Sequence, residues 1–382
     1  MIECSKYKLS ECCLSISDGD HLPPPKVDAG IPFITISDID SSNRLNLDVK
    51  QFVQEEYYNN LKDIRKAQRN DILYSVVGSF GIPVIIKGND KFAFQRHIAI
   101  LRPDSTKVIP DYLFYIMKTY NFYMQADSVA IGAAQRTISL TALRNMTVEL
   151  PSMDVQKKIA TVLSRYDSLI ENYQKQIKLL EEAAQRLYKE WFVNLRFPGH
   201  ENTKIVDGVP EGWEKKKLGS IAPILTGKKD ANYGTPDGNY PFFTCSQEPI
   251  KAPSYSFDAE AVLLAGNGDF NVKLYRGKFE AYQRTYVLIP SNADLLYVLY
   301  NSVAKNMVKL ANGASGSTIK FLTKRMIENI DVLVPTNTIL NEYNSLRRKI
   351  QQDLENIKSQ LRLLTESRDR LLPKLLSGEI EV

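Results

Sequence analysis

Few residues in this chain have the types and spacing that catalysis requires. His97 follows Arg96 and carries the side chain of a general base, but no candidate nucleophile or metal ligand is spaced to work with it. No GxxxxGK phosphate loop or NPPY-type methyltransferase tetrad occurs, and Gly266 and Gly268 lack the third glycine of a dinucleotide fingerprint. The 4 cysteines and 3 histidines show no zinc-ligand spacing. We therefore expect reduced cysteines and a chain with no active site, metal or cofactor of its own.

Cationic and planar polar side chains offer a second kind of chemistry, the recognition of DNA. Lysine and arginine neutralise phosphates, whereas arginine, asparagine and glutamine form paired hydrogen bonds with base edges. The candidate contact residues in turn-rich segments are Gln95, Arg96, Gln135 and Arg136, then Lys228, Lys229, Tyr233, Asn267, Asp269, Lys273, Gln283, Arg284, Ser317 and Lys320, with Asp18 and His21 as weaker candidates.

Some of these segments have a structural alternative. The pair Gln95-Arg96 recurs as Gln283-Arg284. A repeated pair favours a shared role, either a phosphate contact or a structural one, in which it closes a strand or pairs with a local carboxylate, over the reading of bases. The small residues that follow Gly132 and Gly313 form either a simple turn or a loop that donates backbone N–H groups to phosphate. The lysines from Lys215 to Lys217 favour a solvated strand entry over an electrostatic patch.

Length and charge bound the remaining possibilities. A chain of 382 residues is long enough for two or three domains. Its 49 Lys+Arg residues against 44 Asp+Glu residues give a net charge of +5, which permits nucleic-acid binding without arguing for it. No apolar run is long enough to span a membrane, and the N-terminal sequence lacks the apolar core of a signal peptide. We expect a cytoplasmic protein without membrane contact.

The elements that must position these residues are organised around the stretch from Ser152 to Trp191. It contains no Gly or Pro, and its apolar residues recur at heptad spacing. A second stretch with heptad spacing runs from Thr336 to Leu376, and one constant shift along the chain places Tyr166 on Ile350. The seam positions are Ile159, Leu163, Tyr166, Ile170, Tyr173, Ile177, Leu180 and Leu187 in the first helix and Ile350, Leu354, Ile357, Leu361, Leu364 and Leu371 in the second, where Arg368 interrupts the pattern. Two narrow seams predict that one helix packs on the other.

The segments before the two helices are rich in turn signals and short β-like runs, and they repeat each other in outline. IPFIT at 31–35 answers YPFFT at 240–244, and GAAQRTISL at 132–140 answers GASGSTIKF at 313–321. The strands expected in the first segment are Pro32 to Ile36, Ile72 to Val77, Val84 to Ile86 and His97 to Leu101, and its expected helices are Lys50 to Arg69 and Asp111 to Met124.

This repetition predicts an α+β fold made by tandem duplication. Two similar β-rich domains alternate with two long helices. The first domain is expected at residues 1–151, the first helix at 152–194, the second domain at 195–335 and the second helix at 336–382.

Residues 132–192, from GAAQRTISL to KEWF, resemble the central conserved region of the specificity (S) subunit of type I restriction-modification enzymes. The sequence RLLPKLLSGEI near the C-terminus resembles the distal conserved region of the same subunits, so the resemblance covers the whole chain. It implies that each β-rich domain is a target-recognition domain reading one half of a bipartite, asymmetric DNA sequence. It also implies that the helices pair as an antiparallel coiled coil, which sets the spacer between the half-sites.

The resemblance further implies that partner subunits carry the chemistry. Two methyltransferase (modification) subunits would dock on the coiled coil, bind S-adenosylmethionine and methylate adenine. Restriction/translocase subunits would use ATP and Mg to translocate and cleave double-stranded DNA. The chain itself would be the non-catalytic subunit. Tyr188 and Phe192 lie outside the strict heptad rows and either dock a partner or pack under the adjoining domain.

The second copy departs from the family pattern. Gln135 and Gln156 in the first copy are typical of the family, but the sequence comparison places Gly316 opposite Gln135 and finds no glutamine opposite Gln156. This weakens a shared DNA contact by Gln135. A non-enzymatic two-headed protein scaffold and the DNA-recognition subunit of a related phage-defence system stay open as alternatives.

Overall fold

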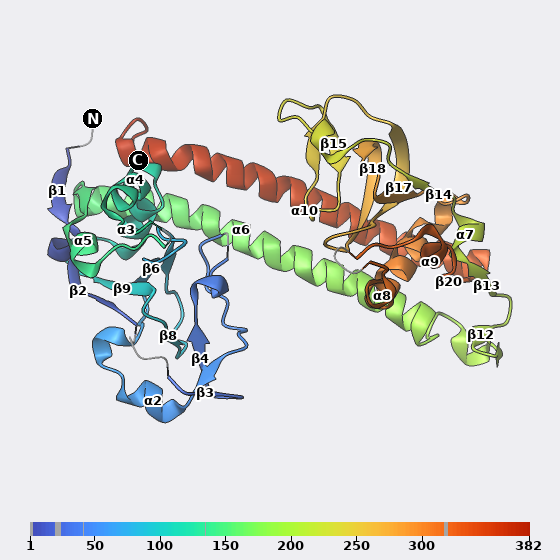
Figure 1. Cartoon of the computed structure of the whole chain (residues 1–382), viewed down its shortest axis with the longest axis horizontal. Coiled ribbons are helices and arrows are strands. Elements are labelled where there is room, and N and C mark those ends of the chain that lie inside the picture. The colour runs from blue at the N-terminus through green and yellow to red at the C-terminus, as the bar shows by residue number, and fades with distance from the viewer. Residues whose placement is uncertain (1–2, 20–23, 41, 134, 317–319) are drawn as a thin grey trace. The chain divides into compact units, whose positions relative to one another are not determined.

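The computed structural model describes residues 3–19, 24–40, 42–133, 135–316 and 320–382. The chain divides into two compact units (Figure 1), the first made of Met1–Gln174 and Gln360–Val382 and the second of Lys175–Ser359. Both boundaries fall inside the long helices α6 (Met153–Tyr188) and α10 (Asn337–Ser377). Each unit therefore contains a β-rich region and part of each long helix.

The first unit contains two four-stranded sheets. One is antiparallel, with the order β2 (Cys13–Asp18), β9 (Ile98–Pro103), β6 (Ile72–Ser75), β7 (Pro83–Ile85). The other has the order β3 (Lys26–Val27), β5 (Phe52–Val53), β4 (Ile31–Ile34), β8 (Ala93–Phe94), and in it β4 and β8 run parallel. A separate pair joins β1 (Ser5–Lys8) to β10 (Thr147–Leu150). The predicted strands are confirmed to within about two residues, the usual uncertainty of element ends.

Strand β9 is covered on both faces. Its residues Ile98, Ala99, Ile100 and Leu101 are all buried. Because successive side chains of a strand point to opposite faces, Ala99 and Leu101 join the larger core, whereas Ile98 and Ile100 join a second, smaller core. An uninterrupted apolar run is what a strand buried on both faces needs.

The helices of the first unit, besides α6 and α10, are α1 (Leu9–Cys12), α2 (Glu55–Asn60), α3 (Pro110–Met117), α4 (Tyr120–Val129) and α5 (Leu140–Asn145). The helix predicted from Lys50 to Arg69 is wrong in extent, because Phe52 and Val53 form β5 and Leu61 is extended. The helix predicted from Asp111 to Met124 is interrupted, since the Thr119 side chain caps α4 by accepting a hydrogen bond from the Phe122 N–H.

The second unit contains a six-stranded sheet with the order β14 (Ile224–Thr226), β19 (Thr285–Leu288), β17 (Phe257–Ala265), β18 (Val272–Ala281), β15 (Tyr240–Phe243), β16 (Ile250–Ala252). Two smaller pairs are β13 (Glu214–Lys217) with β20 (Asp331–Val334) and β11 (Ile205–Val206) with β12 (Val209–Pro210). Its shorter helices are α7 (Leu218–Ile221), α8 (Leu296–Gly313) and α9 (Lys324–Glu328).

The two units share one topology. The order β14-β19-β17-β18 repeats the order β2-β9-β6-β7, and the pair β13-β20 repeats the pair β1-β10. Strand β15 runs parallel to β18 as β4 runs parallel to β8. The predicted duplication is therefore confirmed. Within the described part of the chain, no helix has both the length and the apolar character needed to span a membrane.

Helices α6 and α10 run antiparallel within each unit. In the first unit Lys158 donates to the carbonyl of Val382, and further along α6 Asp167 pairs with Arg368. In the second unit, Lys358 pairs with Glu181 at 2.8 Å. None of the predicted seam residues is exposed: Ile159, Leu163, Ile170 and Leu354 are buried, and Tyr166, Tyr173, Ile177, Leu180, Leu187, Ile350, Ile357, Leu361, Leu364 and Leu371 are half-buried.

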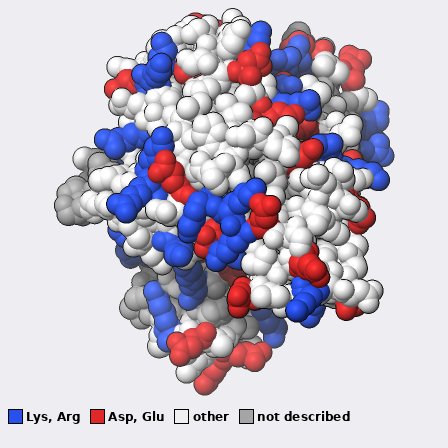
Figure 2. Space-filling view, turned by 90° about the vertical axis from the view of Figure 1, so that its right-hand side faces the viewer, with Lys and Arg blue, Asp and Glu red and all other residues white. Residues whose placement is uncertain are grey.

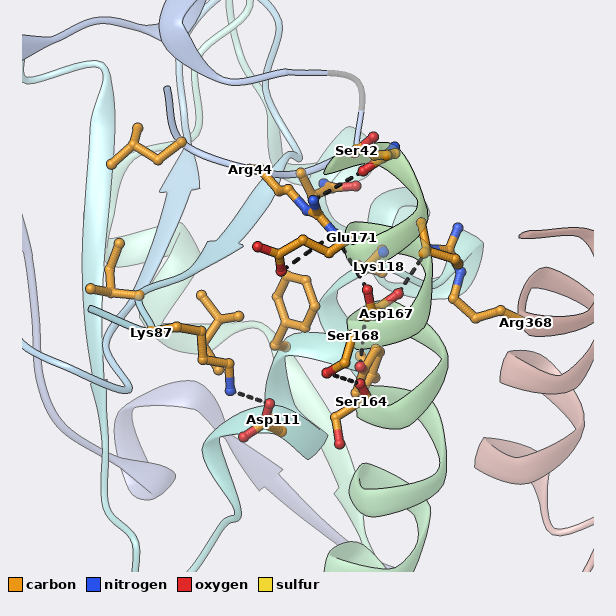
Figure 3. A pocket seen from close by; sticks show the side chains of 18 of the residues that line it. Ser42, Arg44, Lys87, Asp111, Lys118, Ser164, Asp167, Ser168, Glu171 and Arg368 are labelled. Atoms are coloured by element: carbon orange, nitrogen blue, oxygen red, sulfur yellow. Dashed lines mark hydrogen bonds and ion pairs between the residues drawn. The ribbon is translucent and has the colours of Figure 1, made fainter. Parts of the chain in front are cut away.

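Arg368 interrupts the seam because it belongs to a polar contact between three elements of the first unit (Figure 3). Its guanidinium donates to Asp167 at 2.8 Å, and the Tyr115 hydroxyl of α3 donates to the other oxygen of the same carboxylate at 2.8 Å. Burial and the neighbouring carboxylate raise the pKa of Tyr115, so its hydroxyl keeps its proton and remains a donor. This contact ties α3 to both long helices.

A cavity of about 890 Å³ surrounds that contact in the first unit. Arg44, in the segment between β4 and β5, also lines this cavity, donates to Gln174 of α6 at 3.0 Å and lies 3.8 Å from Glu171. An ion pair between Lys87 and Asp111 also lines it (Figure 3). The β-rich part of the first unit is therefore anchored to α6 by paired charges as well as by apolar packing.

Candidate nucleic-acid interface

In the second unit, loops from distant parts of the sequence meet at the turn Gln283-Arg284, which lies between β18 and β19. The Gln283 N–H donates to the carbonyl of Lys229 at 2.9 Å, and the Arg284 carbonyl accepts from the Gly266 N–H at 2.8 Å. The Gly266 carbonyl in turn accepts from the Leu322 N–H at 2.8 Å. These backbone bonds bring most of the candidates of the second domain to one place.

Two of those candidates lie on the loop after β14. Lys228 is exposed, and the ammonium of Lys229 lies 4.3 Å from the centre of the Tyr233 ring. The Tyr233 hydroxyl lies 2.8 Å from Ser254 Oγ, which holds the ring in place. A lysine on an aromatic face keeps its charge available to a phosphate while its stem is ordered.

The turn after β17 carries Asn267 and Asp269. Asn267 Oδ1 accepts from the Cys245 thiol at 2.8 Å, and Asp269 accepts from the Gln247 amide at 2.5 Å. Lys273 donates to the carbonyl of Ser246 at 2.8 Å, and burial lowers its pKa. The segment from Cys245 to Gln247, which sequence reasoning missed, thus supports these candidates. The residue types of this segment do not indicate that it holds other side chains in place.

The cations nearest the turn are open to solvent. Arg284 and Lys320 are exposed. A hollow of about 270 Å³ lies beside Arg284, lined also by Gly266, Gln283, Tyr286 and Leu322. Ser317 lies outside the described residues. Arg284 at this hollow and Lys320 on the neighbouring loop are exposed cations suited to contact an anionic polymer.

The first unit repeats the same backbone arrangement. The Gly19 N–H donates to the Ile98 carbonyl at 3.3 Å, as Gly227 does to Thr285 at 3.2 Å. The Val76 N–H donates to the His97 carbonyl at 2.9 Å, as Gly266 does to Arg284. We call this arrangement the loop frame: residues 18–19, 76–80, 95–98, 131–133 and 135–138 in the first unit, and 226–229, 266–270, 282–285, 315–316 and 320–322 in the second.

The candidates of the first domain differ in whether their side chains are exposed to solvent or already form contacts within the domain. Arg96 and Gln135 are exposed, and Gln95 is half-buried. Arg136 is engaged within the domain, since its guanidinium pairs with Asp127 and lies 5.3 Å from the Phe80 ring centre. The contacts of Arg136 therefore favour a structural role over a DNA contact.

Of the two weaker candidates of this domain, Asp18 lies in the described part of the chain and His21 does not. Asp18 lies 3.8 Å from Arg65. Burial and the adjacent Arg96 guanidinium lower the pKa of His97, so the imidazole is neutral at pH 7. In the described ranges, no group of three or more His, Cys, Asp and Glu residues is placed to hold a metal ion.

The hydrogen bonds correct two matches made from the sequence. Gln95 and Tyr282 donate to equivalent carbonyls of β4 and β15, so the two Gln-Arg pairs are offset by one residue and Arg96 matches Gln283. The segment from Arg96 to Pro103 has the same number of residues as the segment from Gln283 to Pro290. Counting back from the two prolines therefore gives the same match.

The second correction concerns the loop before α5 and α9. Ile131 pairs with Thr137 as Ser315 pairs with Phe321, which places Gly132 opposite Gly316 rather than Gly313. Matching the letters Gly-Ala had shifted this loop by several residues. Arg136 then stands opposite Lys320, so a cation occupies this position in both domains.

The candidate docking residues Tyr188 and Phe192 are buried under the second domain. The Tyr188 hydroxyl lies 2.9 Å from Ser302 Oγ on α8, and the Phe192 ring lies 5.4 Å from the Trp213 ring. Of the two alternatives left open by the sequence, packing under the adjoining domain is therefore the one the structure shows.

Comparison with known proteins identifies the repeated domain. A family model described as "Type I restriction modification DNA specificity domain" matches residues 12–182 and again residues 210–364. The chain is 36% identical over 178 residues to the specificity subunit of the type I restriction enzyme EcoDI of Escherichia coli, a match that covers 45% of this chain and 39% of that one. It is 28% identical over 306 residues to the MjaIX specificity subunit of Methanocaldococcus jannaschii, covering 72% of this chain and 70% of that one.

The fold has a solved counterpart. The crystal structure of the S subunit of a type I restriction-modification system from M. genitalium superposes with a TM-score of 0.67 at 17% identity, covering 98% of this chain and 96% of that chain. The curated relatives are specificity subunits rather than methylating or cleaving subunits, in agreement with the expectation of a non-catalytic chain. Because the family model matches both halves of the duplication, the chain belongs to the family of type I restriction-modification DNA specificity proteins.

Proposed function

We propose that this chain is the subunit that determines which DNA sequence a type I restriction-modification complex recognises. Each specificity domain binds one half of a bipartite, asymmetric target in double-stranded DNA, and the paired helices set the spacer between the halves. One observation carries the proposal: the loop frame occurs in both units with different exposed side chains. A duplicated frame with divergent side chains is suited to reading two different sequences, which a two-headed protein scaffold would not require.

The charge distribution suggests that the chain shares the task of holding DNA. On the side of the molecule shown in Figure 2, lysine and arginine side chains are interspersed with aspartate and glutamate. The net charge of +5 is small for a chain of this length that binds DNA alone. Exposed cations such as Lys320 contact the phosphates, and partner subunits supply much of the remaining phosphate contact.

The chemistry belongs to those partners. Two methyltransferase subunits bind S-adenosylmethionine and methylate adenine, and restriction/translocase subunits use ATP and Mg. Exposed leucines on the long helices, Leu169 and Leu179 on α6 and Leu346 and Leu363 on α10, are available for docking the methyltransferase subunits. A complex that modifies the genome of a bacterium or archaeon works in the cytoplasm, where we place this chain.

The test is selection of bound DNA from a randomised duplex library by the chain co-purified with its methyltransferase. The proposal predicts two short fixed sequences separated by a constant number of unspecified base pairs. A single contiguous motif, or DNA binding without any sequence preference, would contradict it. Methyl transfer to adenine within the selected duplexes separates a restriction-modification complex from a related defence system that binds DNA without modifying it.

A further inference from the structure

The loop frame is held by glycines at matching positions in both domains. An added Cβ at Gly19 would lie 2.2 Å from the carbonyl oxygen of Phe94, and one at Gly227 would lie 1.9 Å from that of Ala281. No side chain fits at either distance. The loop after the first strand of each sheet can therefore approach the turn before β9 or β19 only because it carries glycine.

Two further pairs of glycines share a backbone conformation that favours glycine. Gly78 and Gly268 have φ angles of 71° and 67°, and Gly132 and Gly316 have φ angles of 108° and 105°. Such angles are costly for residues with a Cβ. The main chain of the frame thus has nearly the same φ angle at each of these two pairs of glycines.

The side chains between these glycines are not the same. The backbone hydrogen bonds of the frame match the two domains residue by residue, and this match differs from the one made by comparing the letters of the two repeats. The side chains at the matched positions below are exposed or half-buried in both domains. The matched pairs, first domain before second, are Asp18 and Thr226, Val77 and Asn267, Ser79 and Asp269, Arg96 and Gln283, and His97 and Arg284.

We infer that these positions are the base-reading residues of each domain, and that the glycines only hold them in place. The inference rests on the proposed function. A residue that contacts phosphate has the same task in both domains, since the backbone of DNA carries no sequence information. A residue that reads a base has a different task wherever the two half-sites differ. Positions with one backbone and two different side chains are therefore those that specify sequence.

The chemistry of the side chains indicates which bases they read. Asn267 and Gln283 in the second domain match the paired donor and acceptor of adenine, and Arg284 matches the two acceptors of guanine. Asp269 can accept a hydrogen bond from the amino group of cytosine while Gln247 donates to it. In the first domain Arg96 is the residue suited to guanine. The second half-site is thus expected to contain at least one adenine and one guanine at neighbouring positions.

The test uses Arg284→Ala in the complete complex with its methyltransferase, assayed against duplexes in which each base pair of both half-sites is changed in turn. The variant is expected to lose discrimination at one guanine of the second half-site by about 10- to 100-fold, with the rest unchanged. Discrimination in the first half-site, measured on the same protein, reports that the complex is intact. Arg276→Ala is the matched control, because Arg276 is an exposed arginine on β18 that pairs with Glu260 away from the frame.

A second variant exchanges the turn itself. Arg96→Gln with His97→Arg gives the first domain the residues of the second at matched positions, and it should move one base preference of the first half-site toward that of the second. The inference is overturned if Arg284→Ala leaves every preference unchanged. It is also overturned if the variant weakens binding to all duplexes equally and lowers the salt dependence, which is the signature of a phosphate contact. Absence of sequence preference in the unsubstituted complex would instead contradict the proposed function.

Discussion

Arg368 is a charged residue at a position where the heptad pattern predicts an apolar one. In the structure it forms an ion pair with Asp167. Its side chain is 16% exposed and that of its partner Asp167 is 25% exposed, so both are shielded from water. Removing one member of such a pair leaves the other partly buried without its counter-charge, which costs more than the intact pair contributes.

Arg368→Leu is therefore expected to lower the free energy of unfolding by about 1–3 kcal/mol, although leucine fits the heptad pattern. Urea denaturation of the complex measures the loss. The control is Arg362→Leu on the same helix, whose pair with Glu366 is exposed and whose loss should cost at most about 0.5 kcal/mol. Equal losses for the two substitutions would show that the shielded pair with Asp167 stabilises the fold no more than the exposed pair with Glu366.

Tyr115 makes the same contact dependent on pH. Its pKa is raised above the ordinary value of 10.0 by burial and by Asp167, so the folded state binds this proton more tightly than the unfolded state. The stabilisation is present in full below pH 10 and is lost as the pH rises above it. Tm measured above pH 10 should fall less steeply in Tyr115→Phe than in the unsubstituted protein. A slope unchanged by Tyr115→Phe, or one changed equally by Tyr120→Phe at a residue 73% exposed, would argue against this account.

At the scale of elements, the loop frame depends on close approach of backbone segments. Gly227→Ala places a methyl group against the carbonyl of Ala281, and the resulting shift is expected to cost about 1–3 kcal/mol and to weaken recognition of the second half-site. Thermal unfolding and binding to duplexes altered in one half-site measure both effects. At Gly313 of α8 the nearest atom to an added Cβ is the Met326 methyl carbon at 3.4 Å, so Gly313→Ala should be nearly neutral. Loss of first half-site recognition by Gly227→Ala would contradict the assignment.

The helices and strands were largely predictable from the sequence because their signals are local. Heptad spacing placed the start of each long helix within about one residue, and apolar runs bounded by turn residues located the strands. The prediction failed where local signals compete. Phe52 and Val53 look compatible with a helix, but they pair with β3 and β4, which only the folded sheet reveals.

The site was less predictable because hydrogen bonds between distant segments define it. The identical letters of Gln95-Arg96 and Gln283-Arg284 suggested one shared position, yet the bonds to β4 and β15 set them one residue apart. Single-sequence reasoning found the exposed cations Arg96 and Arg284. It missed Val77, Ser79 and the segment from Cys245 to Gln247, because these residue types do not indicate DNA binding. Only their positions in the loop frame connect them with the other candidates.

At the scale of the whole molecule, the proposal makes the paired helices a ruler. Inserting four residues into both α6 and α10 lengthens each by about 6 Å, at 1.5 Å per residue. Since base pairs rise about 3.4 Å, the preferred spacer should grow by about one or two base pairs while both half-site sequences stay fixed. Library selection with the lengthened complex measures this. An insertion in α6 alone is the control and should disrupt the pairing. An unchanged spacer would show that the helices are not the ruler.

The most direct test of the central claim is a map of methylated adenines in native genomic DNA from the source cell, compared with a strain that lacks this chain. The account predicts one asymmetric motif of two fixed parts and a constant gap, methylated in the parent strain and unmethylated throughout the genome of the deletion strain. Restoring the chain with Arg284→Ala should return the motif with one relaxed position in a single half. Identical methylation maps in the parent and deletion strains would contradict the account.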